Sequence, residues 1–462
     1  MADLMEKIVD FVINTQYKDL SSDVVNYAKN HILDTVGIIT AGSSSEGISA
    51  MVELANEWGG KHESTVPLYG YKLPVPSVAF AIGPMARAWD FGGVHPDANE
   101  HTTEYVLPAA LPVAEKLRCS GKDLILAVAL GNEIISRIGA SVHTITGVSM
   151  ARTHSVFRVW GPVIAVGKLL GLSKPEMIDA IGLSYTQGGC DNKMFVDGVL
   201  KIRAQHGLVA DTAIKCVYMA QRGITGTKKV LEGEKGFYEA FYPRYDLNWI
   251  LNGLEEKNFI ATKTIIKGYP TCTYTHSSIE TALECIIEND IQSEEIKEVK
   301  VGVNTPTYKL VALPLETRYH PATPADAQFS IPYSVACAVV NRKVFIDDYL
   351  DKALKRHEIQ EMTQKVRVEI DPDIEKTDPV GFAGAKVVVM TKNGKRYDKR
   401  IDHVKGTPQN PMSSEELEKK FRGCMNFSVN KLAETNIDHM IDKFRNLEDE
   451  TDVSQLVKLL CP

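Results

Sequence analysis

The chain has 462 residues, of which 44% are hydrophobic and 24% are charged, and its formal net charge is -7. This length exceeds what one ordinary hydrophobic core accommodates, so we expect a globular protein of two domains. The acidic balance and the absence of Lys/Arg runs argue against a nucleic-acid-binding surface. The sequence contains no run of 18 consecutive apolar residues, so no membrane-spanning helix is predicted.

The cysteines and the start of the sequence indicate a cytoplasmic protein. Residues 1–7 lack the basic and apolar regions of a secretory signal. The eight cysteines are dispersed and form no C-x-x-C pair. This pattern is typical of reduced, mostly buried thiols, and it argues against a disulfide framework or an iron–sulfur cluster.

Helical periodicity dominates the first 265 residues. Helices are predicted near the start, after residue 22, and over 104–118, 122–138, 156–170 and 199–222. Ser173 and Glu176 form a capping box, so another helix should begin there. Residues 61–76, which contain three prolines, are predicted to form an irregular loop. No strand is predicted before about residue 265.

From about residue 266 the pattern changes to alternation with period two. Residues 297–303 and 365–370 are predicted strands, and 386–397 is predicted to be a hairpin around Asn393-Gly394. Helices are predicted over 274–288 and 326–341, and a capping box at Ser413 and Glu416 should start further helices. The expected fold is mainly α with a smaller α+β domain: an all-helical domain (1–265), an inserted lid-like α+β domain (266–405), and C-terminal helices (406–462) that return to the helical domain.

Residues 90–101 are predicted to form a loop that is rich in ionisable side chains. Two histidines, three carboxylates and an amide lie there between the apolar segments 77–89 and 105–117. Loops that carry ionisable groups between rigid elements are favoured places for catalysis, although a solvated connection between helices is the alternative. His95, Glu100 and His101 could instead bind zinc or iron, but their spacing matches no helix-borne metal signature.

Several motifs occur in a fixed order along the chain. They are Asp34-Thr-Val-Gly37, Asp90-Phe91…His101 with Val106-Leu-Pro-Ala109, Arg152-Thr-His154…Gly161, Lys201…His206-Gly207, Gln221-Arg-Gly-Ile-Thr-Gly226, Lys267-Gly-Tyr-Pro-Thr-Cys272…His276, Ala327-Gln-Phe-Ser-Ile-Pro-Tyr333 and Gly406-Thr-Pro. Together they resemble the MmgE/PrpD family, which includes 2-methylcitrate dehydratases, cis-aconitate decarboxylases and iminodisuccinate epimerases. The resemblance covers nearly the whole chain.

The resemblance implies a homodimeric enzyme that acts on small di- or tricarboxylates without a metal or organic cofactor. It also implies that the active-site residues converge on a cleft between the two domains. These residues are Asp90, His101, His154, Lys201 and Lys267. Cys272 stands at a position that is histidine in the decarboxylases, and the weaker candidates for substrate binding are Arg152, Arg203, His206, Cys272 and His95.

Dehydration of a hydroxy polycarboxylate assigns roles to these residues. It needs a base beside a carboxylate, an acid for the leaving hydroxyl, and cations for the carboxylates. His101 is expected to transfer the proton, or else to cap the helix that follows it. Asp90 would orient a catalytic side chain or cap a helix, and His154 precedes a helix start, which is a natural anion site. Lys201 and Lys267 are predicted carboxylate clamps, although a lone lysine is by default a surface residue.

One stretch departs from the family pattern. Many relatives carry a D-x-x-D-T-like arrangement after the first aspartate, where this chain has Gly92-Gly93-Val94. The change removes a carboxylate and a hydroxyl from the expected site, and Cys272 further argues against cis-aconitate decarboxylation. We therefore expect a lyase that dehydrates a small hydroxy di- or tricarboxylate, like a 2-methylcitrate dehydratase. An epimerase or isomerase of a substituted succinate is the alternative, and a non-catalytic carboxylate-binding homologue is the third.

Overall fold

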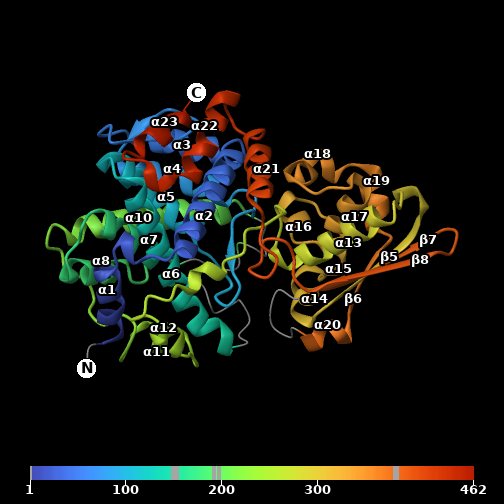
Figure 1. Ribbon diagram of the computed structural model, residues 1–462, viewed down its shortest axis with the longest axis horizontal. Coiled ribbons are helices and arrows are strands. Elements are labelled where there is room, and N and C mark those ends of the chain that lie inside the picture. The colour runs from blue at the N-terminus through green and yellow to red at the C-terminus, as the bar shows by residue number, and fades with distance from the viewer. Residues whose placement is uncertain (1–2, 147–155, 190–193, 195–198, 378–383, 462) are drawn as a thin grey trace. The chain divides into compact units, whose positions relative to one another are not determined.

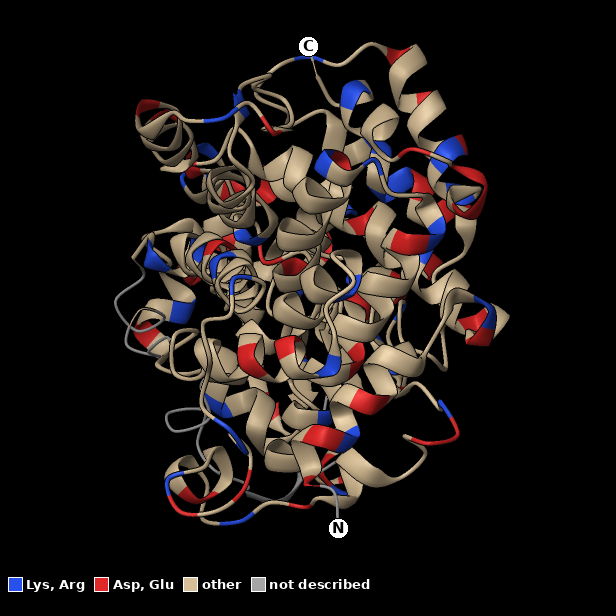
Figure 2. Ribbon diagram, turned by 90° about the vertical axis from the view of Figure 1, so that its left-hand side faces the viewer, with Lys and Arg blue, Asp and Glu red and all other residues tan. Residues whose placement is uncertain are grey.

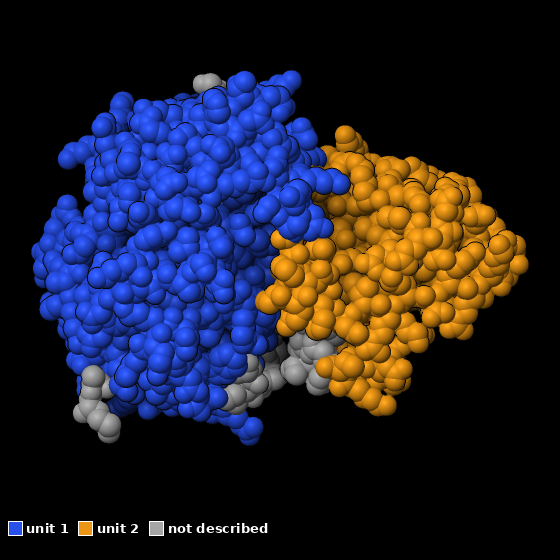
Figure 3. Space-filling view, in the orientation of Figure 1, with its two compact units in different colours: residues 1–88, 92–266, 413–462 blue, residues 89–91, 267–412 orange. Residues whose placement is uncertain are grey.

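The computed structural model describes the chain except for residues 1–2, 147–155, 190–193, 195–198, 378–383 and 462 (Figure 1). It divides into two compact units, coloured separately in Figure 3. Unit 1 comprises residues 1–88, 92–266 and 413–462, and unit 2 comprises residues 89–91 and 267–412. These bounds differ from the predicted ones in three places, because residues 89–91 and 406–412 group with unit 2 and residue 266 groups with unit 1.

Unit 1 is built from helices. Its longer helices are α1 (Leu4–Asn14), α2 (Ser22–Gly42), α3 (Ile48–Trp58), α4 (Val75–Arg87), α5 (Thr103–Leu117), α6 (Gly121–Thr146), α7 (Trp160–Leu169), α8 (Lys174–Ser184), α10 (Lys201–Ala220), α21 (Ser414–Met425) and α22 (Glu434–Arg445). The capping boxes predicted at Ser173–Glu176 and Ser413–Glu416 both start helices, α8 and α21. Basic and acidic residues are interspersed along the ribbon (Figure 2).

The C-terminal helix α21 packs against α2, so the two ends of the chain share one core. Lys420 of α21 lies 2.6 Å from Asp34 of α2, and both side chains are buried. Gly37 faces Phe421 at this crossing, where a Cβ would lie 3.1 Å from the Phe421 ring. The Asp34-Thr-Val-Gly37 motif therefore contributes to helix packing.

One stretch of α6 is long and apolar enough to cross a membrane by length and composition alone. This stretch, Gly121–His143, has its most apolar window entirely buried inside the fold. Because core helices of soluble proteins meet the same criterion, it is weak evidence for a membrane span.

Unit 1 also contains two short antiparallel ladders, which corrects the expectation of no strand before residue 265. β1 (Ser64–Thr65) pairs with β2 (Lys72–Leu73), and β3 (Val94–His95) pairs with β4 (Glu100–His101). Strands of two residues are too short for any alternation of apolar and polar residues to be visible in the sequence. The loop 90–101 therefore contains a small hairpin, and Val94 also pairs with Ile265.

Unit 2 is an α+β unit with one four-stranded sheet. The strands are β5 (Ile296–Val303), β6 (Val366–Ile370), β7 (Ala385–Thr391) and β8 (Arg396–Ile401), in the order β6-β5-β7-β8. β5 runs parallel to β6 and antiparallel to β7, and β7–β8 is the predicted hairpin, with Gly394 at φ +84° in its turn. The prediction of a mainly α protein with a smaller α+β domain is confirmed.

Two helices cover one face of this sheet. They are α13 (His276–Glu288) and α17 (Ile331–Asn341), which pack against the apolar side formed by residues such as Val299 and Val387. The helix predicted over 326–341 is divided into α16 (Pro324–Gln328) and α17, because Ser330 caps a new start with Pro332 in its first turn. The seven described cysteines are free thiols, as their dispersion predicted.

Candidate functional site

A close helix crossing positions the first side chains of the candidate site. Helices α4 and α10 meet at Gly83 and Gly207, where a Cβ on Gly83 would lie 2.5 Å from the backbone nitrogen of Gly207. Only glycine permits such an approach. Arg87 follows Gly83 by one helical turn, and His206 directly precedes Gly207, so the crossing brings a cation and an imidazole into the interior of unit 1. Both are buried, with exposed fractions of 5% and 3%.

Glu104 lies between two histidines at the start of α5. Its Oε2 is 3.2 Å from Nδ1 of His101 and 3.6 Å from Nε2 of His206. Burial opposes ionisation of this carboxyl, but His101, His206 and Arg87 outweigh it and hold the pKa of Glu104 well below its usual range. The cluster therefore contains a buried carboxylate anion. Of its three side chains, that of His101 has the largest exposed fraction, 18%.

Hydrogen bonding within this His101–Glu104–His206 cluster is incomplete. Among the described residues, no hydrogen bond of ideal geometry reaches either carboxylate oxygen of Glu104 or either ring nitrogen of His206, although the two imidazoles lie 3.2 and 3.6 Å from the carboxylate. Leaving a buried polar group unsatisfied costs roughly 1–3 kcal/mol. Because folded proteins keep few such groups, their concentration in one cluster makes it the candidate functional site of unit 1.

An aromatic and charged network holds the ring of His206. Tyr105 stacks on it with ring centroids 3.9 Å apart and an interplanar angle of 14°. Nη1 of Arg158 donates to the Tyr105 hydroxyl at 3.1 Å, and Arg158 also binds both carboxylate oxygens of Glu100 at 2.6 and 2.9 Å. Burial lowers the pKa of His206 to about 4 despite the nearby Glu104. His206 is therefore neutral near pH 7.

Close packing explains why residues 92 and 93 are both glycine. A Cβ on Gly92 would overlap the carboxylate of Glu104, and a Cβ on Gly93 would lie 2.8 Å from both the His31 ring and the carbonyl oxygen of Ile265. The expectation that this stretch removes a carboxylate from the site is therefore revised, because Glu104 places one directly beside residue 92.

Asp90 and Lys267 form a second cluster, inside unit 2. The Lys267 ammonium donates to the Asp90 carboxylate, the Asp90 carbonyl and the Thr271 carbonyl, each at 2.9 Å. An ammonium group has three protons, and all three are used. We therefore assign Lys267 to holding Asp90, whose φ is +49°, in place of the predicted carboxylate clamp.

Cys272 follows this cluster in the chain. It is 7% exposed, and its backbone N–H donates to the carbonyl of Gln328 at 3.0 Å. The Gln328 amide donates in turn to the carbonyls of Trp89 and Pro270, at 2.6 and 2.8 Å. These bonds tie the segment 89–91 to the rest of unit 2. They give Gln328, part of the Ala327–Tyr333 motif, a structural role.

His95 is a structural residue of the β3–β4 hairpin. Its Nε2 donates to the carbonyl of Ile260 at 2.9 Å, and its Nδ1 accepts from the N–H of Ala98 at 3.2 Å. Both ring nitrogens are thus used by the backbone, and burial lowers its pKa to about 4. We withdraw His95 as a substrate-binding candidate. The metal interpretation also loses its basis, since Glu100 binds Arg158 instead.

The remaining predicted residues have varied placements. Lys201 begins α10 with an exposed side chain. Arg203 is half-buried, and its Nη1 donates to the carbonyl of Glu46 at 2.6 Å. Arg152 and His154 lie outside the described residues.

Two family models match the chain. The MmgE/PrpD N-terminal domain matches residues 6–250, and the MmgE/PrpD C-terminal domain matches residues 269–446. The chain belongs to the MmgE/PrpD family. Membership supports an enzyme of the dehydratase or decarboxylase type that processes carboxylates.

Individual relatives of this MmgE/PrpD protein are similar over almost their whole length. Cis-aconitate decarboxylase of Aspergillus terreus is 26% identical, with 99% of this chain and 96% of the relative covered. Cis-aconitate decarboxylase of Homo sapiens is 26% identical, with coverages of 96% and 91%. The enzyme of the same name from Mus musculus is 23% identical, with coverages of 98% and 93%.

Sequence reasoning missed Arg87, Glu104, Tyr105 and Arg158. A signal for two of them was present: Arg87 and Glu104 are single charged residues within or beside apolar helical segments. Charged side chains on such segments are rarely buried unless they are paired or functional. Their partners, however, come from other helices, which one sequence does not reveal.

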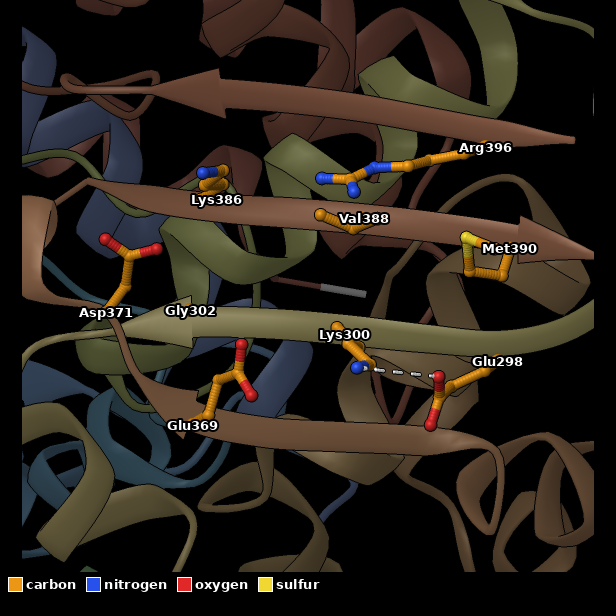
Figure 4. Close-up of a pocket in the computed structure, with 9 residues that line it drawn as sticks. All are labelled: Glu298, Lys300, Gly302, Glu369, Asp371, Lys386, Val388, Met390 and Arg396. Atoms are coloured by element: carbon orange, nitrogen blue, oxygen red, sulfur yellow. Dashed lines mark ion pairs between the residues drawn. The ribbon is translucent and has the colours of Figure 1, made fainter.

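A separate hollow lies on the open face of the unit 2 sheet (Figure 4). Its volume is about 390 Å³, and its charged lining residues are Glu298, Lys300, Glu369, Asp371, Lys386 and Arg396. No histidine lines it, and charges of both signs are mixed across it.

Proposed function

We propose that this protein is a lyase that eliminates water from a small hydroxy di- or tricarboxylate without a metal or organic cofactor. The observation that carries the proposal is the buried His101–Glu104–His206 cluster with Arg87 beside it. It combines a partly exposed imidazole, a fixed carboxylate and a buried cation. Proton transfer next to a carboxylate requires these kinds of group.

In this proposal His101 exchanges the proton. Its Nδ1 faces Glu104 at 3.2 Å, so Nε2 is the ring nitrogen that meets the substrate. The base removes a proton from the carbon next to a carboxylate, the released electron pair forms the C=C bond, and the hydroxyl leaves as water after it receives a proton. Arg87 contributes positive charge that offsets the carboxylates gathered there.

Other predicted residues keep proposed roles in substrate binding. Lys201 is an exposed residue at the start of α10, and Arg152 and His154 belong to one of the motifs that led to the family. Asp90, held by Lys267, offers a second fixed carboxylate. We further propose the homodimer that the family resemblance implies, which sedimentation of the purified protein tests.

Decarboxylation of a cis-aconitate-like acid is the second candidate. The similarity to the cis-aconitate decarboxylases of Aspergillus terreus and Homo sapiens favours it. In that reaction the bond to a carboxylate breaks, carbon dioxide leaves, and an acid such as protonated His101 delivers a proton to the carbon. Cys272, at a position that is histidine in decarboxylases of the family, argues against it.

A substrate panel separates the candidates. The purified protein is incubated with citrate, 2-methylcitrate, cis-aconitate and substituted succinates, and each reaction is followed by absorbance of unsaturated acids, carbon dioxide release and NMR in deuterated water. Unsaturated acid from a hydroxy acid supports the proposal. Carbon dioxide from cis-aconitate supports the second candidate. Deuterium exchange without elimination indicates an epimerase or isomerase, and binding with none of these signals indicates a non-catalytic homologue.

A further inference from the structure

We propose that Glu104 is a positioning residue for His101, and that its carboxylate fills the space that a side chain on residue 92 would otherwise occupy. The role in catalysis rests on the proposed function. The geometry itself stands independently of the substrate, because it is given by the contacts of Glu104 with His101, His206 and Gly92.

The first step of the argument concerns the tautomer of His101. A neutral imidazole carries one proton, and the partner of one ring nitrogen decides where that proton lies. Nδ1 of His101 is 3.2 Å from Oε2 of Glu104, which is within hydrogen-bond distance. A carboxylate only accepts, so it keeps the proton on Nδ1. Nε2 then has its lone pair directed away from Glu104, ready to act as a base.

The second step concerns the charge of Glu104. Its side chain is 1% exposed, and a buried carboxyl without cations would be neutral. The imidazoles of His101 and His206 face it as possible N–H donors, and Arg87 supplies the buried positive charge, so the anion is favoured, which is the state required to hold Nδ1–H. Glu104, three residues after His101 in the sequence, is therefore in the charge state that orients the His101 ring.

The third step concerns space. A Cβ on Gly92 would lie 2.5 Å from both Cγ and Cδ of Glu104. Gly92 does not have a positive φ, and the three atoms nearest to a Cβ there all belong to the Glu104 side chain, so that side chain is the main obstacle. The site can therefore take a carboxylate from residue 104 or from residue 92, but it cannot accommodate both.

Activity measurements on four variants test whether Glu104 positions His101 and whether it fills the space beside residue 92. Glu104→Gln keeps the shape and removes the charge, so we expect kcat to fall about 100-fold while KM changes less than about threefold. In Glu104→Ala we expect kcat to fall at least as far. Gly92→Asp alone should lose activity through the overlap with Glu104. The kcat of the double variant Glu104→Ala/Gly92→Asp should be about tenfold or more above that of Glu104→Ala, because the new carboxylate enters the vacated space.

The matched control is Glu115→Gln, which changes another buried carboxylate of α5. Glu115 accepts from the hydroxyl and N–H of Thr65, away from His101. Its loss should lower the unfolding temperature and leave kcat unchanged. Wild-type kcat in Glu104→Gln, or a folded double variant no more active than Glu104→Ala, would overturn the proposal.

A spectroscopic measurement keeps the test independent of the substrate. ¹⁵N NMR of histidine-labelled protein distinguishes Nδ1–H from Nε2–H imidazoles, and His101→Gln identifies the His101 signals. We expect His101 to be the Nδ1–H tautomer in the wild type and to lose this preference in Glu104→Gln. If no member of the substrate panel reacts, the proposed function fails, yet this tautomer result still supports or refutes the role of Glu104. An Nε2–H tautomer in the wild type refutes it.

Discussion

Lys267→Met should destabilise unit 2 by several kcal/mol. The substitution keeps most of the apolar stem but removes the ammonium that donates three hydrogen bonds of 2.9 Å. The Asp90 carboxylate that remains has a side chain only 6% exposed. Removing one partner of a buried ion pair costs about 3–5 kcal/mol, because an uncompensated charge stays behind. The two carbonyls that lose a charged donor add to this loss, so we expect at least about 3 kcal/mol.

Urea unfolding followed by tryptophan fluorescence measures this effect. Trp89 is the one tryptophan of unit 2, since Trp58, Trp160 and Trp249 belong to unit 1. A Trp89→Phe background identifies the transition that belongs to unit 2.

Two further variants make the Lys267 experiment decisive. Lys399→Met removes a partly exposed lysine of the same unit that pairs with Glu284 and Glu288, so it should cost no more than about 1 kcal/mol. Asp90→Asn/Lys267→Met removes the stranded charge and should be more stable than Lys267→Met alone. Our reasoning is refuted if Lys267→Met is no more destabilising than Lys399→Met.

Two other predictions concern unit 1. Burial lowers the pKa of His95 to about 4, whereas an unfolded histidine titrates near about 6.5. Between these values the unfolded chain binds the proton at His95 and the folded chain does not, so the contribution of His95 to the free energy of unfolding should fall by on the order of 2–3 kcal/mol as the pH drops through this window. Urea titrations of wild type and His95→Gln check this, and an equal pH dependence in both contradicts it. Arg158→Met removes the cation that binds the buried Glu100 carboxylate and one donor to the Tyr105 hydroxyl, so it should lower the unfolding temperature and reduce kcat. A variant as stable and active as the wild type would remove the network around His206 from the account.

Much of the fold could be predicted because long elements repeat their pattern many times. The helix predicted over 104–118 is Thr103–Leu117, and the predicted hairpin is β7–β8. Features set by tertiary contacts escaped prediction. The two-residue strands β3 and β4 carry too little periodicity to detect, and the grouping of residues 89–91 with unit 2 depends on bonds such as Gln328 to the Trp89 carbonyl.

The candidate site was predictable in part, for the same reason. The loop 90–101 was recognised by its concentration of ionisable groups, and His101 keeps its place there. Composition could not tell His101, which is partly exposed, from His95, which is buried with both ring nitrogens bonded to backbone. Nor could it show that Glu104 meets His206, because α5 and α10 come together only through the packing of unit 1.

Solvent-proton exchange by His101 tests the central claim most directly. The unsaturated product of the best substrate is incubated in deuterated water with wild type and with folded His101→Ala, and NMR follows deuterium at the carbon next to a carboxylate in the hydroxy acid formed by the reverse addition of water. We predict that the wild type incorporates deuterium during turnover, and that His101→Ala loses at least about 100-fold of both exchange and turnover. Near-normal exchange in His101→Ala would contradict the account.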